Sequence, residues 1–482
     1  MASLDYLFTP GAVAIVGASE RHGENHHIKS FVRSRQLGKF KGGLYVVNPA
    51  IESVLGVKSY ARLTDIPGPV DYVIVVYQTL TAAAILNVMK DCAAKRVRAV
   101  TVFSSGFAEE TQRSGSSRGK ELQELLVRLA REGGFRLIGP NCLGLYYYKS
   151  GLVTAPNQAE DANTEGGISV VAQSSGAAGI LYGLCTDAGL HVGKVASIGN
   201  SADLTIEEFL EYYTEDDETK TILAYIESAS NGRRFFDAMK NACVKKPVIV
   251  LKGGVTAAGV EVAVSHTAAL STGVSLYEVA FKQAGAISAA SFEEMADVAQ
   301  ALQASPAIGG SRVAIITNVT TARTIDIAVR NGLDPVPLDA EVSAKLKALA
   351  LQAGEVNTMT TRSVDLGIAM ASVWGQAMEL VGSRPYVDVV VLVQSLDAAT
   401  SSPSEYVRTI AAKRDRLRKP VVIVSHAIFE DRDNALPRAE VGKLLCAAGV
   451  PVYPSIDRAS RAVALAVGYN SRRRTEITDA CS

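Results

Sequence analysis

The sequence predicts an α/β protein of three tandem domains, each built on a doubly wound parallel sheet. Short runs rich in Val, Ile and Ala recur along nearly the whole chain, and longer amphipathic segments separate them. Unbroken apolar runs of about four to seven residues are typical of parallel strands covered on both faces, and the intervening segments of crossover helices. The 482 residues allow about three domains of ~150 residues each. Forty glycines against 12 Phe and one Trp also favour this class over an aromatic-cored β sandwich.

Ten apolar runs mark the expected strands. They lie at Ala12–Val16, Leu44–Val47, Tyr72–Val76, Ala99–Phe103, Ile168–Ala172, Ile222–Ile226, Val248–Leu251, Val313–Ile316, Val387–Val393 and Val421–Val424. Residues 149–167 and 303–311 lose this periodicity and collect Gly, Pro, Ser, Asn and Asp, which is typical of linkers. We therefore expect domains at residues 1–150, 160–305 and 310–470, followed by a basic, polar tail at 471–482.

The second and third of these domains resemble each other in sequence. KPVIVLKG at 246–253 is similar to KPVVIVSH at 419–426, TILAYIES at 221–228 to DVVVLVQS at 388–395, and ISVVAQSS at 168–175 to RVAIITNV at 312–319. The three pairs of segments keep their order, and the spacing between the copies changes only moderately along the chain. This pattern indicates an internal duplication; the alternative is that buried strands simply look alike.

Charge and cysteine content exclude several classes of protein. Lys+Arg and Asp+Glu both number 49, so no broad electrostatic footprint for nucleic acid or an anionic membrane is expected. The N-terminus has neither a basic region nor an apolar core, and no apolar run approaches the ~18 residues of a membrane span. The six cysteines lie far apart without a CxxC motif, which argues against metal and disulfide frameworks. We expect a soluble cytoplasmic protein without a metal site.

The first strand runs into the turn Gly17-Ala18-Ser19, which is expected to open a helix. A helix start at this place in a doubly wound sheet binds anions through its free N–H groups and dipole. The full G-x-G-x-x-G fingerprint is missing, and the second strand ends in Asn48-Pro49 where a nicotinamide dinucleotide site needs an acid. The pattern argues against NAD and leaves coenzyme A as the candidate ligand; the alternative is a plain tight turn.

Two further turns follow strands at the same predicted edge of this sheet. One contains Ser105 and Gly106, and the other is GPNCLG with Asn141 and Cys142. Glycines at such points let the backbone approach a ligand closely, so Ser105, Gly106 and Asn141 are candidate coenzyme A contacts. Cys142 is interpreted as a small buried or loop thiol rather than a nucleophile, because no His accompanies it by motif.

The second domain contains a histidine loop. The strand at 248–251 ends in Lys252, and a Gly-, Ala- and Thr-rich loop then presents His266 between Ser265 and Thr267. A neutral imidazole is available as a nucleophile near pH 7.

Two other features of this domain give His266 a chemical context. Glu227 follows a strand at its carboxyl end, where it can hold one ring N–H of a histidine. Ser174, Ser175 and Gly176 open a helix and offer hydroxyls and amides to a phosphoryl group. A carboxylate, an imidazole and an anion-binding helix start are what a phosphohistidine enzyme needs.

A serine hydrolase is the competing interpretation of the same residues. Ser174, Asp203 and His266 have the chain order of an α/β-hydrolase triad. However, Ala172 replaces the first glycine of the nucleophile elbow, and a glycine-rich loop holds a general base poorly.

Taken together and in order, the motifs of the chain resemble those of a known family. They are LFTPGAVAIVGAS, VVNP, SSGFAEE, GPNCLGL, QSSGAAG, SIGNSADL, TILAYIES, KPVIVLKGG, SHTAAL and GVPVYPSIDRASRAV. Over about residues 5–470 the chain is similar to the α-type subunit of the NDP-forming acyl-CoA synthetases (ADP-forming acetate–CoA ligases), relatives of succinyl-CoA synthetase. The resemblance implies a Rossmann-like CoA-binding domain followed by two flavodoxin-like ligase domains.

The resemblance also implies a chemical relay. ATP phosphorylates His266, a carboxylic acid takes the phosphoryl group to become an acyl phosphate, and the CoA thiol then forms acyl-CoA. Glu227 matches the acid that supports the histidine, and Ser175 and Gly176 the helix start that receives the phosphohistidine. Gly17, Ala18 and Ser19 match the CoA-binding turn, and Lys252 is expected as a structural or phosphate-neighbouring charge.

A partner subunit follows from the same resemblance. No ATP-grasp segment follows residue 482, so an ATP-grasp β subunit is expected to bind ATP and Mg²⁺, in an α2β2 assembly. The substrate is expected to be a small carboxylic acid of unknown identity. The alternative is a CoA- or acyl-CoA-binding regulatory protein that has lost turnover.

Several positions depart from the family pattern. Ala268 stands where Gly usually follows SHT, and TNVTTAR and NTMTTRSVDL replace two familiar third-domain motifs. The third-domain copy of Glu227 is Gln394, and His426 directly follows a strand without a loop, so His426 is expected to be structural. These changes leave the His266 chemistry intact.

Overall fold

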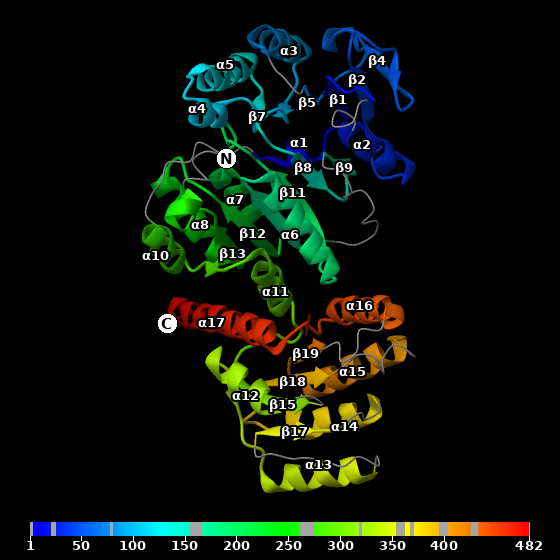
Figure 1. Ribbon diagram of the computed structural model, residues 1–482, viewed down its shortest axis with the longest axis vertical. Coiled ribbons are helices and arrows are strands. Elements are labelled where there is room, and N and C mark those ends of the chain that lie inside the picture. Colours follow the sequence, from blue (N-terminus) through cyan, green and yellow to red (C-terminus); the bar gives the residue numbers. More distant parts are fainter. Residues whose placement is uncertain are drawn as a thin grey trace. The chain divides into compact units, whose positions relative to one another are not determined.

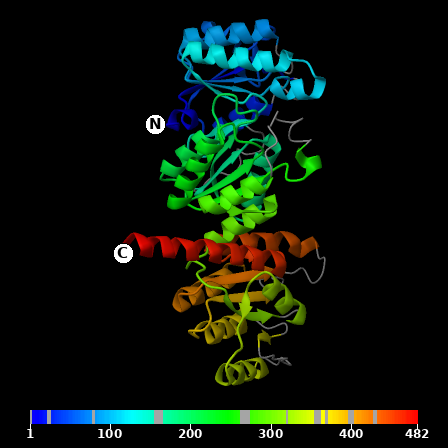
Figure 2. The same cartoon turned by 90° about the vertical axis from the view of Figure 1, so that its left-hand side faces the viewer.

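The computed structural model describes residues 3–20, 26–77, 81–154, 166–260, 274–317, 321–352, 362–366, 371–394, 403–425 and 432–481. The chain divides into two compact units, Met1–Tyr182 with His191–Ala289, and Gly183–Leu190 with Ala290–Ser482. Three sheets dominated by parallel pairs, with helices on both sides of each, confirm the predicted fold class (Figure 1, and turned by 90° in Figure 2). The three domain boundaries drawn from the sequence stay a prediction.

The first sheet lies in the first unit and has the strand order β3-β4-β2-β1-β5-β6-β7. Its strands are β1 (Ala12–Val16), β2 (Gly43–Val47), β3 (Ser53–Val54), β4 (Val57–Tyr60), β5 (Tyr72–Val75), β6 (Ala99–Val102) and β7 (Arg136–Ile138). Its helices are α2 (His26–Gln36), α3 (Ala82–Lys95), α4 (Ala108–Ser114) and α5 (Arg118–Gly133), with a 3-10 turn at Leu63–Asp65. The short α1 (Asp5–Phe8) instead packs through Phe8 against Tyr147 and Tyr213, which belong to the second sheet and its helices. All pairs are parallel except β3 with β4.

The second sheet, in the same unit, has the order β14-β13-β12-β10-β11-β8-β9. Its strands are β8 (Gly144–Tyr147), β9 (Leu152–Val153), β10 (Ile168–Ala172), β11 (Val192–Ser197), β12 (Thr221–Ile226), β13 (Val248–Lys252) and β14 (Ile287–Ser288). Its helices are α6 (Ser175–Asp187), α7 (Ile206–Glu215), α8 (Gly232–Lys245) and α10 (Val274–Ala284). The sequence analysis did not predict β8 and β9, which add an antiparallel edge through the pairing of β8 with β11.

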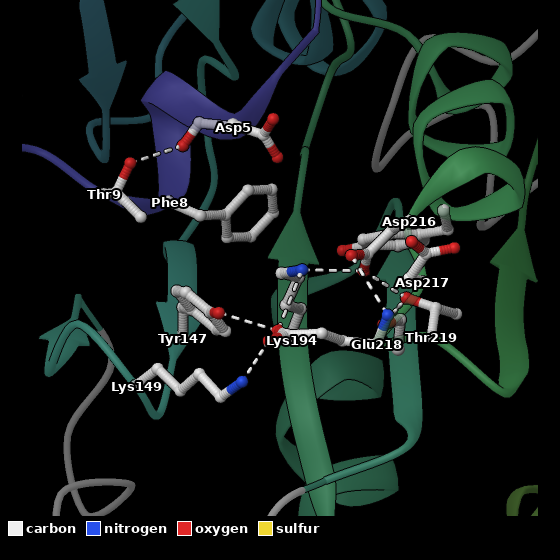
Figure 3. A network of polar contacts seen from close by, with 12 residues as sticks. Asp5, Phe8, Thr9, Tyr147, Lys149, Lys194, Asp216, Asp217, Glu218 and Thr219 are labelled. Atoms are coloured by element: carbon white, nitrogen blue, oxygen red, sulfur yellow. Dashed lines mark hydrogen bonds and ion pairs between the residues drawn. The ribbon is translucent and has the colours of Figure 1, made fainter.

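A buried cation ties this antiparallel edge to the sheet. Lys194, in β11, is 4% exposed and lies 2.6 Å from Asp216 Oδ2 and 3.5 Å from Glu218 Oε2. Its ammonium also lies 4.7 Å from the ring centre of Tyr147, whose hydroxyl donates to Glu218 (Figure 3). A buried charge is tolerated only when it is paired and hydrogen-bonded, so the acids of the α7–β12 loop and the aromatic edge hold Lys194 in place.

The third sheet belongs to the second unit and has the order β16-β15-β18-β19-β20, with β17 also paired to β15. Its strands are β15 (Arg312–Thr317), β16 (Asp334–Pro335), β17 (Ser363–Asp365), β18 (Val389–Gln394), β19 (Val421–Ser425) and β20 (Val452–Tyr453). The helices are α11 (Phe292–Leu302), α12 (Thr321–Arg330), α13 (Ala340–Gln352), α14 (Ala371–Gly382), α15 (Pro403–Leu417), α16 (Arg432–Ala447) and α17 (Ile456–Cys481). Residues 471–481, expected as a tail, therefore continue α17.

The second and third sheets share one strand order. The sequence β14-β13-β12-β10-β11 in the second corresponds to β20-β19-β18-β15-β16 in the third. Ala172 pairs with Tyr225, and the residues that the sequence similarity aligns with these two, Ile316 and Leu392, pair with each other as well. The common order and register support the duplication. The alignment of β13 with β19 is kept less well, because β19 pairs with β18 one residue out of this register.

No helix in the described part of the chain is long and apolar enough to cross a membrane.

Candidate functional site

The predicted CoA turn follows β1 and is held by the neighbouring strand. Gly17 has a φ of +89°, and its N–H donates to Val47 O at 2.9 Å. A Cβ at Gly17 would lie 2.8 Å from the Tyr77 ring, so the position needs glycine. Asn48 Nδ2 donates to Ala18 O at 3.1 Å, which brings the predicted residues of this turn together with Asn48.

The loop after β6 contains Ser105 and Gly106, which are both exposed. Gly106 has a φ of +101°. Glu109 Oε1 accepts the N–H groups of Gly106 and Phe107 at 2.6 and 3.1 Å. A buried carboxylate therefore fixes the backbone of this loop.

The loop after β7 contains Asn141 and Cys142. Asn141 has a φ of +60°, and its N–H donates to Ser104 O at 3.0 Å, which joins this loop to the loop after β6. Cys142 is 1% exposed, and burial raises the pKa of its thiol to about 12. A thiol with this pKa is protonated at neutral pH, which agrees with the interpretation of Cys142 as a packed side chain.

The predicted phosphate-binding residues stand at the start of α6. Ser174 Oγ accepts the N–H of Ala177 at 3.4 Å, and Ser175 Oγ lies 3.1 Å from Ser197 Oγ at the end of β11. The same Ser197 hydroxyl accepts the N–H of Leu143 at 3.2 Å. Ser197 therefore links the predicted phosphate-binding helix start to the loop that carries Asn141.

Glu227 directly follows β12 and is 7% exposed. Gln173 Oε1 accepts the N–H groups of Glu227 and Ser228 at 2.6 and 3.0 Å, and Gln173 Nε2 donates to Ser228 O at 2.9 Å. These bonds tie the carboxyl ends of β10 and β12 together. Burial, the negative charge of Glu227 and a hydrogen bond to Glu227 raise the pKa of the Tyr225 hydroxyl to about 12.

Lys252 ends β13 and stabilises the same strand ends. Its ammonium donates to the carbonyl oxygen of Glu227 at 2.8 Å and to Gly253 O, and it lies 4.9 Å from the centre of the Tyr277 ring. Burial lowers the pKa of Lys252, and the charge of Glu227 opposes this shift. Of the two roles expected for Lys252, these contacts fit the structural one.

His266 and the flanking Ser265 and Thr267 lie outside the described residues, as does His426. Of the expected phosphohistidine site, the described residues therefore include Glu227, the start of α6 and the hydrogen bonds at the strand ends around them. Within the ranges that the structure describes, no three His, Cys, Asp or Glu side chains gather as metal ligands.

The hydrolase interpretation fails on Asp203. Its Oδ2 accepts Arg136 Nε at 2.9 Å and the N–H of Leu137 at 2.8 Å, and its Oδ1 accepts Arg136 Nη2 at 3.3 Å. Both carboxylate oxygens are thus engaged at the start of β7, and Asp203 is an ion-pair partner rather than the acid of a triad.

Sequence reasoning missed two residues of this region, Ser197 and Asn200, as site residues. Asn200 Nδ2 donates to Glu109 Oε2 at 2.5 Å and to Gln123 Oε1 at 3.0 Å, and its N–H donates to Pro140 O at 3.0 Å. Both residues belong to the SIGN segment that ends β11, and its glycine and asparagine after a strand were the available signal.

Two family models match the chain. A CoA binding domain matches residues 11–148, and a succinyl-CoA ligase like flavodoxin domain matches residues 165–302.

Curated relatives match most of the chain. It is 31% identical over 462 residues to ADP-forming acetate–CoA ligase II subunit alpha of Pyrococcus furiosus, covering 93% of this chain and 94% of that one. It is 29% identical over 476 residues to the corresponding type I subunit alpha of the same organism, covering 96% of both. Against the ADP-forming acetate–CoA ligase of Methanocaldococcus jannaschii it is 32% identical over 315 residues, which cover 65% of this chain and 42% of that protein.

A solved structure is similar over the full length. It is the dinucleotide forming acetyl-coenzyme A synthetase 1 of Ca. Korarchaeum cryptofilum, in complex with phosphate and ADP. The TM-score is 0.81 at 26% identity, with 100% of both chains covered.

Proposed function

Because the chain belongs to the ADP-forming acetate–CoA ligase family, we propose that it is the α-type subunit of a ligase that converts a small carboxylic acid, CoA and ATP to acyl-CoA, ADP and phosphate. One observation carries this proposal. The hydroxyl of Ser197 contacts both the start of α6 and the loop of Asn141, so a phosphate site and a CoA site would be neighbours. A relay from a phosphorylated side chain to a thioester needs this proximity.

In the proposed relay His266 is the nucleophile. Its ring nitrogen takes the terminal phosphoryl group of ATP, and ADP leaves. Glu227 holds the other ring N–H, which keeps the attacking nitrogen unprotonated and stabilises the charged phosphohistidine. Glu227 is buried, and Gln173 and Lys252 bind its backbone N–H and carbonyl oxygen. Its backbone is therefore anchored at the strand end, which supports this role because a preorganised group needs less rearrangement as the charge develops.

The second half of the relay uses the start of α6. Ser174, Ser175 and Gly176 offer hydroxyls and the positive end of a helix dipole to the phosphoryl group. The acid's carboxylate oxygen attacks phosphorus, the N–P bond breaks, and an acyl phosphate forms. The CoA thiolate then attacks the acyl carbon, and phosphate leaves.

Residues of the first sheet would hold coenzyme A beside this point. The turn of Gly17, Ala18 and Ser19, with Asn48 and Pro49, would receive its phosphates, and Ser105, Gly106 and Asn141 would line the path of the thiol arm. The positive φ angles of Gly17, Gly106 and Asn141 favour this, because tight turns of this kind let the backbone approach a ligand closely.

The nucleotide is proposed to bind a separate ATP-grasp β subunit with Mg²⁺, in an α2β2 assembly. Relatives named as subunit alpha favour a partner chain. We also place the protein in the cytoplasm, because its six cysteines lie far apart in the sequence without a CxxC motif, which fits a reducing compartment.

The test is labelling of the chain with ATP carrying radioactive terminal phosphate, in the presence of the β subunit. We expect acid-labile, base-stable label on the chain, and acyl-CoA on addition of acid and CoA. His266→Ala abolishes the label, and His426→Ala is the matched control that retains it. Label surviving in His266→Ala, or acyl-CoA formed by the purified chain alone, contradicts the proposal. CoA binding without any label identifies a regulatory binder instead.

A further inference from the structure

A polar bridge joins the loop after β6 to the loop after β11. Glu109, at the start of α4, is 9% exposed and has three hydrogen-bond donors. Two are the N–H groups of Gly106 and Phe107, both on Oε1. The third is Asn200 Nδ2, which lies 2.5 Å from Oε2 and comes from a residue 91 positions further along the chain.

The two carboxylate oxygens of Glu109 therefore have different tasks. Oε1 reaches back to the N–H groups of the loop before its own helix, as the acid of a capping box does at the N-cap residue. Oε2 faces the second sheet's loop and takes no part in capping. Burial of a carboxylate costs free energy unless donors surround it, and Asn200 supplies the donor that the cap does not need.

An asparagine at position 200 fits these contacts better than an aspartate would. Its Nδ2 uses both protons, one for Glu109 and one for Gln123 Oε1 at 3.0 Å, while its Oδ1 accepts Asn141 Nδ2 at 3.5 Å. An aspartate at this place has no proton to donate and would set two carboxylates against each other.

The backbone of the same loop is close-packed against the loop of Asn141. Asn200 N–H donates to Pro140 O at 3.0 Å, and Ala202 N–H donates to Gly139 O at 3.0 Å. A Cβ at Gly199, whose φ is +51°, would overlap the carbonyl oxygens of both Pro140 and Asn141. The loop after β11 is thus fixed to both loops of the first sheet.

We propose that Glu109 and Asn200 are a positioning pair that holds the CoA-binding loop of Ser105 and Gly106 against the end of β11, beside the phosphate-binding start of α6. This inference rests on the proposed function for the identity of the ligand. The pair sets the place of the thiol arm relative to the acyl phosphate. It takes no part in phosphorylation of the histidine.

A reciprocal exchange tests the pair directly. In Asn200→Asp the new carboxylate cannot donate to Glu109, and in Glu109→Gln the new amide turns its own donor toward the donor of Asn200. In the double variant, which combines Glu109→Gln with Asn200→Asp, the new amide donates to the new carboxylate, and its oxygen still accepts the Gly106 and Phe107 N–H groups. The net charge of the double variant equals that of the wild type.

Two measurements are made on the full chain with its β subunit. The dissociation constant of CoA, by calorimetry, is expected to rise about 10-fold or more in each single variant. In the double variant the dissociation constant of CoA returns to within about threefold of wild type, because the two new side chains bond each other. Residues in direct contact show such a coupling energy in a double-mutant cycle. The rate of acyl transfer from acyl phosphate to CoA follows the same pattern, whereas histidine labelling by ATP stays at the wild-type level.

The control is Glu124→Gln on α5, where Glu124 is exposed and forms a 4.0 Å ion pair with Lys120. It removes one carboxylate from the same neighbourhood and is expected to leave CoA affinity unchanged. Wild-type CoA affinity in both single variants, or losses that merely add in the double variant, overturns the inference. Because CoA affinity is measured without turnover, failure of the histidine labelling counts against the proposed function and not against the pair.

Discussion

The second and third sheets share a strand order but differ in the residues at the carboxyl ends of their strands. After β10 and β12 the second sheet has Gln173 and Glu227, and the side chain of Gln173 bonds the backbone N–H of Glu227 at 2.6 Å and the backbone of Ser228 at 2.9 and 3.0 Å. At the positions that the sequence similarity aligns with them in the third sheet stand Thr317 and Gln394, both buried. Gln394 Nε2 donates to Tyr406 there, so a neutral pair replaces the carboxylate.

This difference shows that the residues which form the strands are not the residues which determine the chemistry at the strand ends. The strands of both sheets are almost wholly buried and apolar, and this pattern is sufficient for the common topology. The residues at the carboxyl ends of these strands are buried too, but they need not be apolar. Only the second sheet keeps a carboxylate at the aligned position, so we expect only that sheet to support phosphoryl transfer.

Glu227→Gln, which gives the second sheet the amide of the third, should be the most damaging of these substitutions. We expect histidine labelling to slow by about 10³-fold or more, because an amide cannot hold the imidazole in the reactive tautomer or stabilise its positive charge. Single-turnover labelling with the β subunit measures this rate. Gln394→Glu is the matched control and should change labelling less than about twofold. Equal losses in the two variants would refute the division between the sheets.

The next prediction concerns the stability contributed by Lys194, the buried cation of the second sheet. Lys194→Met leaves Asp216, which is 9% exposed in its side chain, without its cation, and we expect the unfolding free energy of the first unit to fall by about 3 kcal/mol. Urea denaturation measures the change. The control, Lys245→Met, breaks an exposed 2.7 Å pair with Glu215 and should cost less than about 1 kcal/mol. Similar values for both would show that burial of Lys194 is irrelevant.

Acid should weaken the first unit through His27. This side chain is 1% exposed, its Nδ1 bonds Thr154 O, and burial lowers its pKa to about 4. The folded pKa lies below the ordinary value near 6.5, so the stabilisation is present above pH 6.5 and is lost as pH falls toward 4, by up to about 3 kcal/mol. In His27→Leu the stability of the first unit, measured by hydrogen exchange between pH 6.5 and about 4, should fall less than in the wild type.

The second unit provides the internal comparison for this experiment. Burial raises the pKa of Asp297, and its ion pair with Arg458 opposes the shift. Protonation of Asp297 in acid therefore favours the folded state, and this residue gives no loss of stability as pH falls. If the first unit of His27→Leu loses stability in acid as steeply as the first unit of the wild type, the loss is due to groups other than His27.

The smallest effect concerns the neutral pair of the third sheet. Tyr406→Phe leaves the buried Gln394 amide without its acceptor, and we expect a loss of about 1 to 2 kcal/mol in the second unit. Chemical denaturation measures it. Tyr386→Phe, which removes a 2.9 Å bond to the Asp339 carboxylate at a more exposed site, is the control and should cost less. Neither variant should alter histidine labelling, and a change in labelling would show that the third sheet takes part in the chemistry.

Periodicity predicted most of the fold because parallel strands buried on both faces are recognisable as apolar runs. It missed β8 and β9, which have Gly, Tyr and Leu in short segments beside a linker. β8 is held by pairing with β11, and β9 by pairing with β8, rather than by their own pattern. Motifs likewise placed Gly17, Asn48 and Glu227 at strand ends. They did not identify Ser197 or Glu109 as site residues, because the importance of these side chains depends on partners far away in the chain.

The fold class, the family and the residue types available for phosphoryl transfer can all be inferred from the sequence, since these depend on local pattern and ordered motifs. Which of those residues contact one another is seen only in the folded chain. There Asp203 pairs with Arg136, Lys252 with the backbone beside Glu227, and Asn200 with Glu109. Such pairings are set by how strands and loops distant in sequence pack together, and no local pattern encodes them.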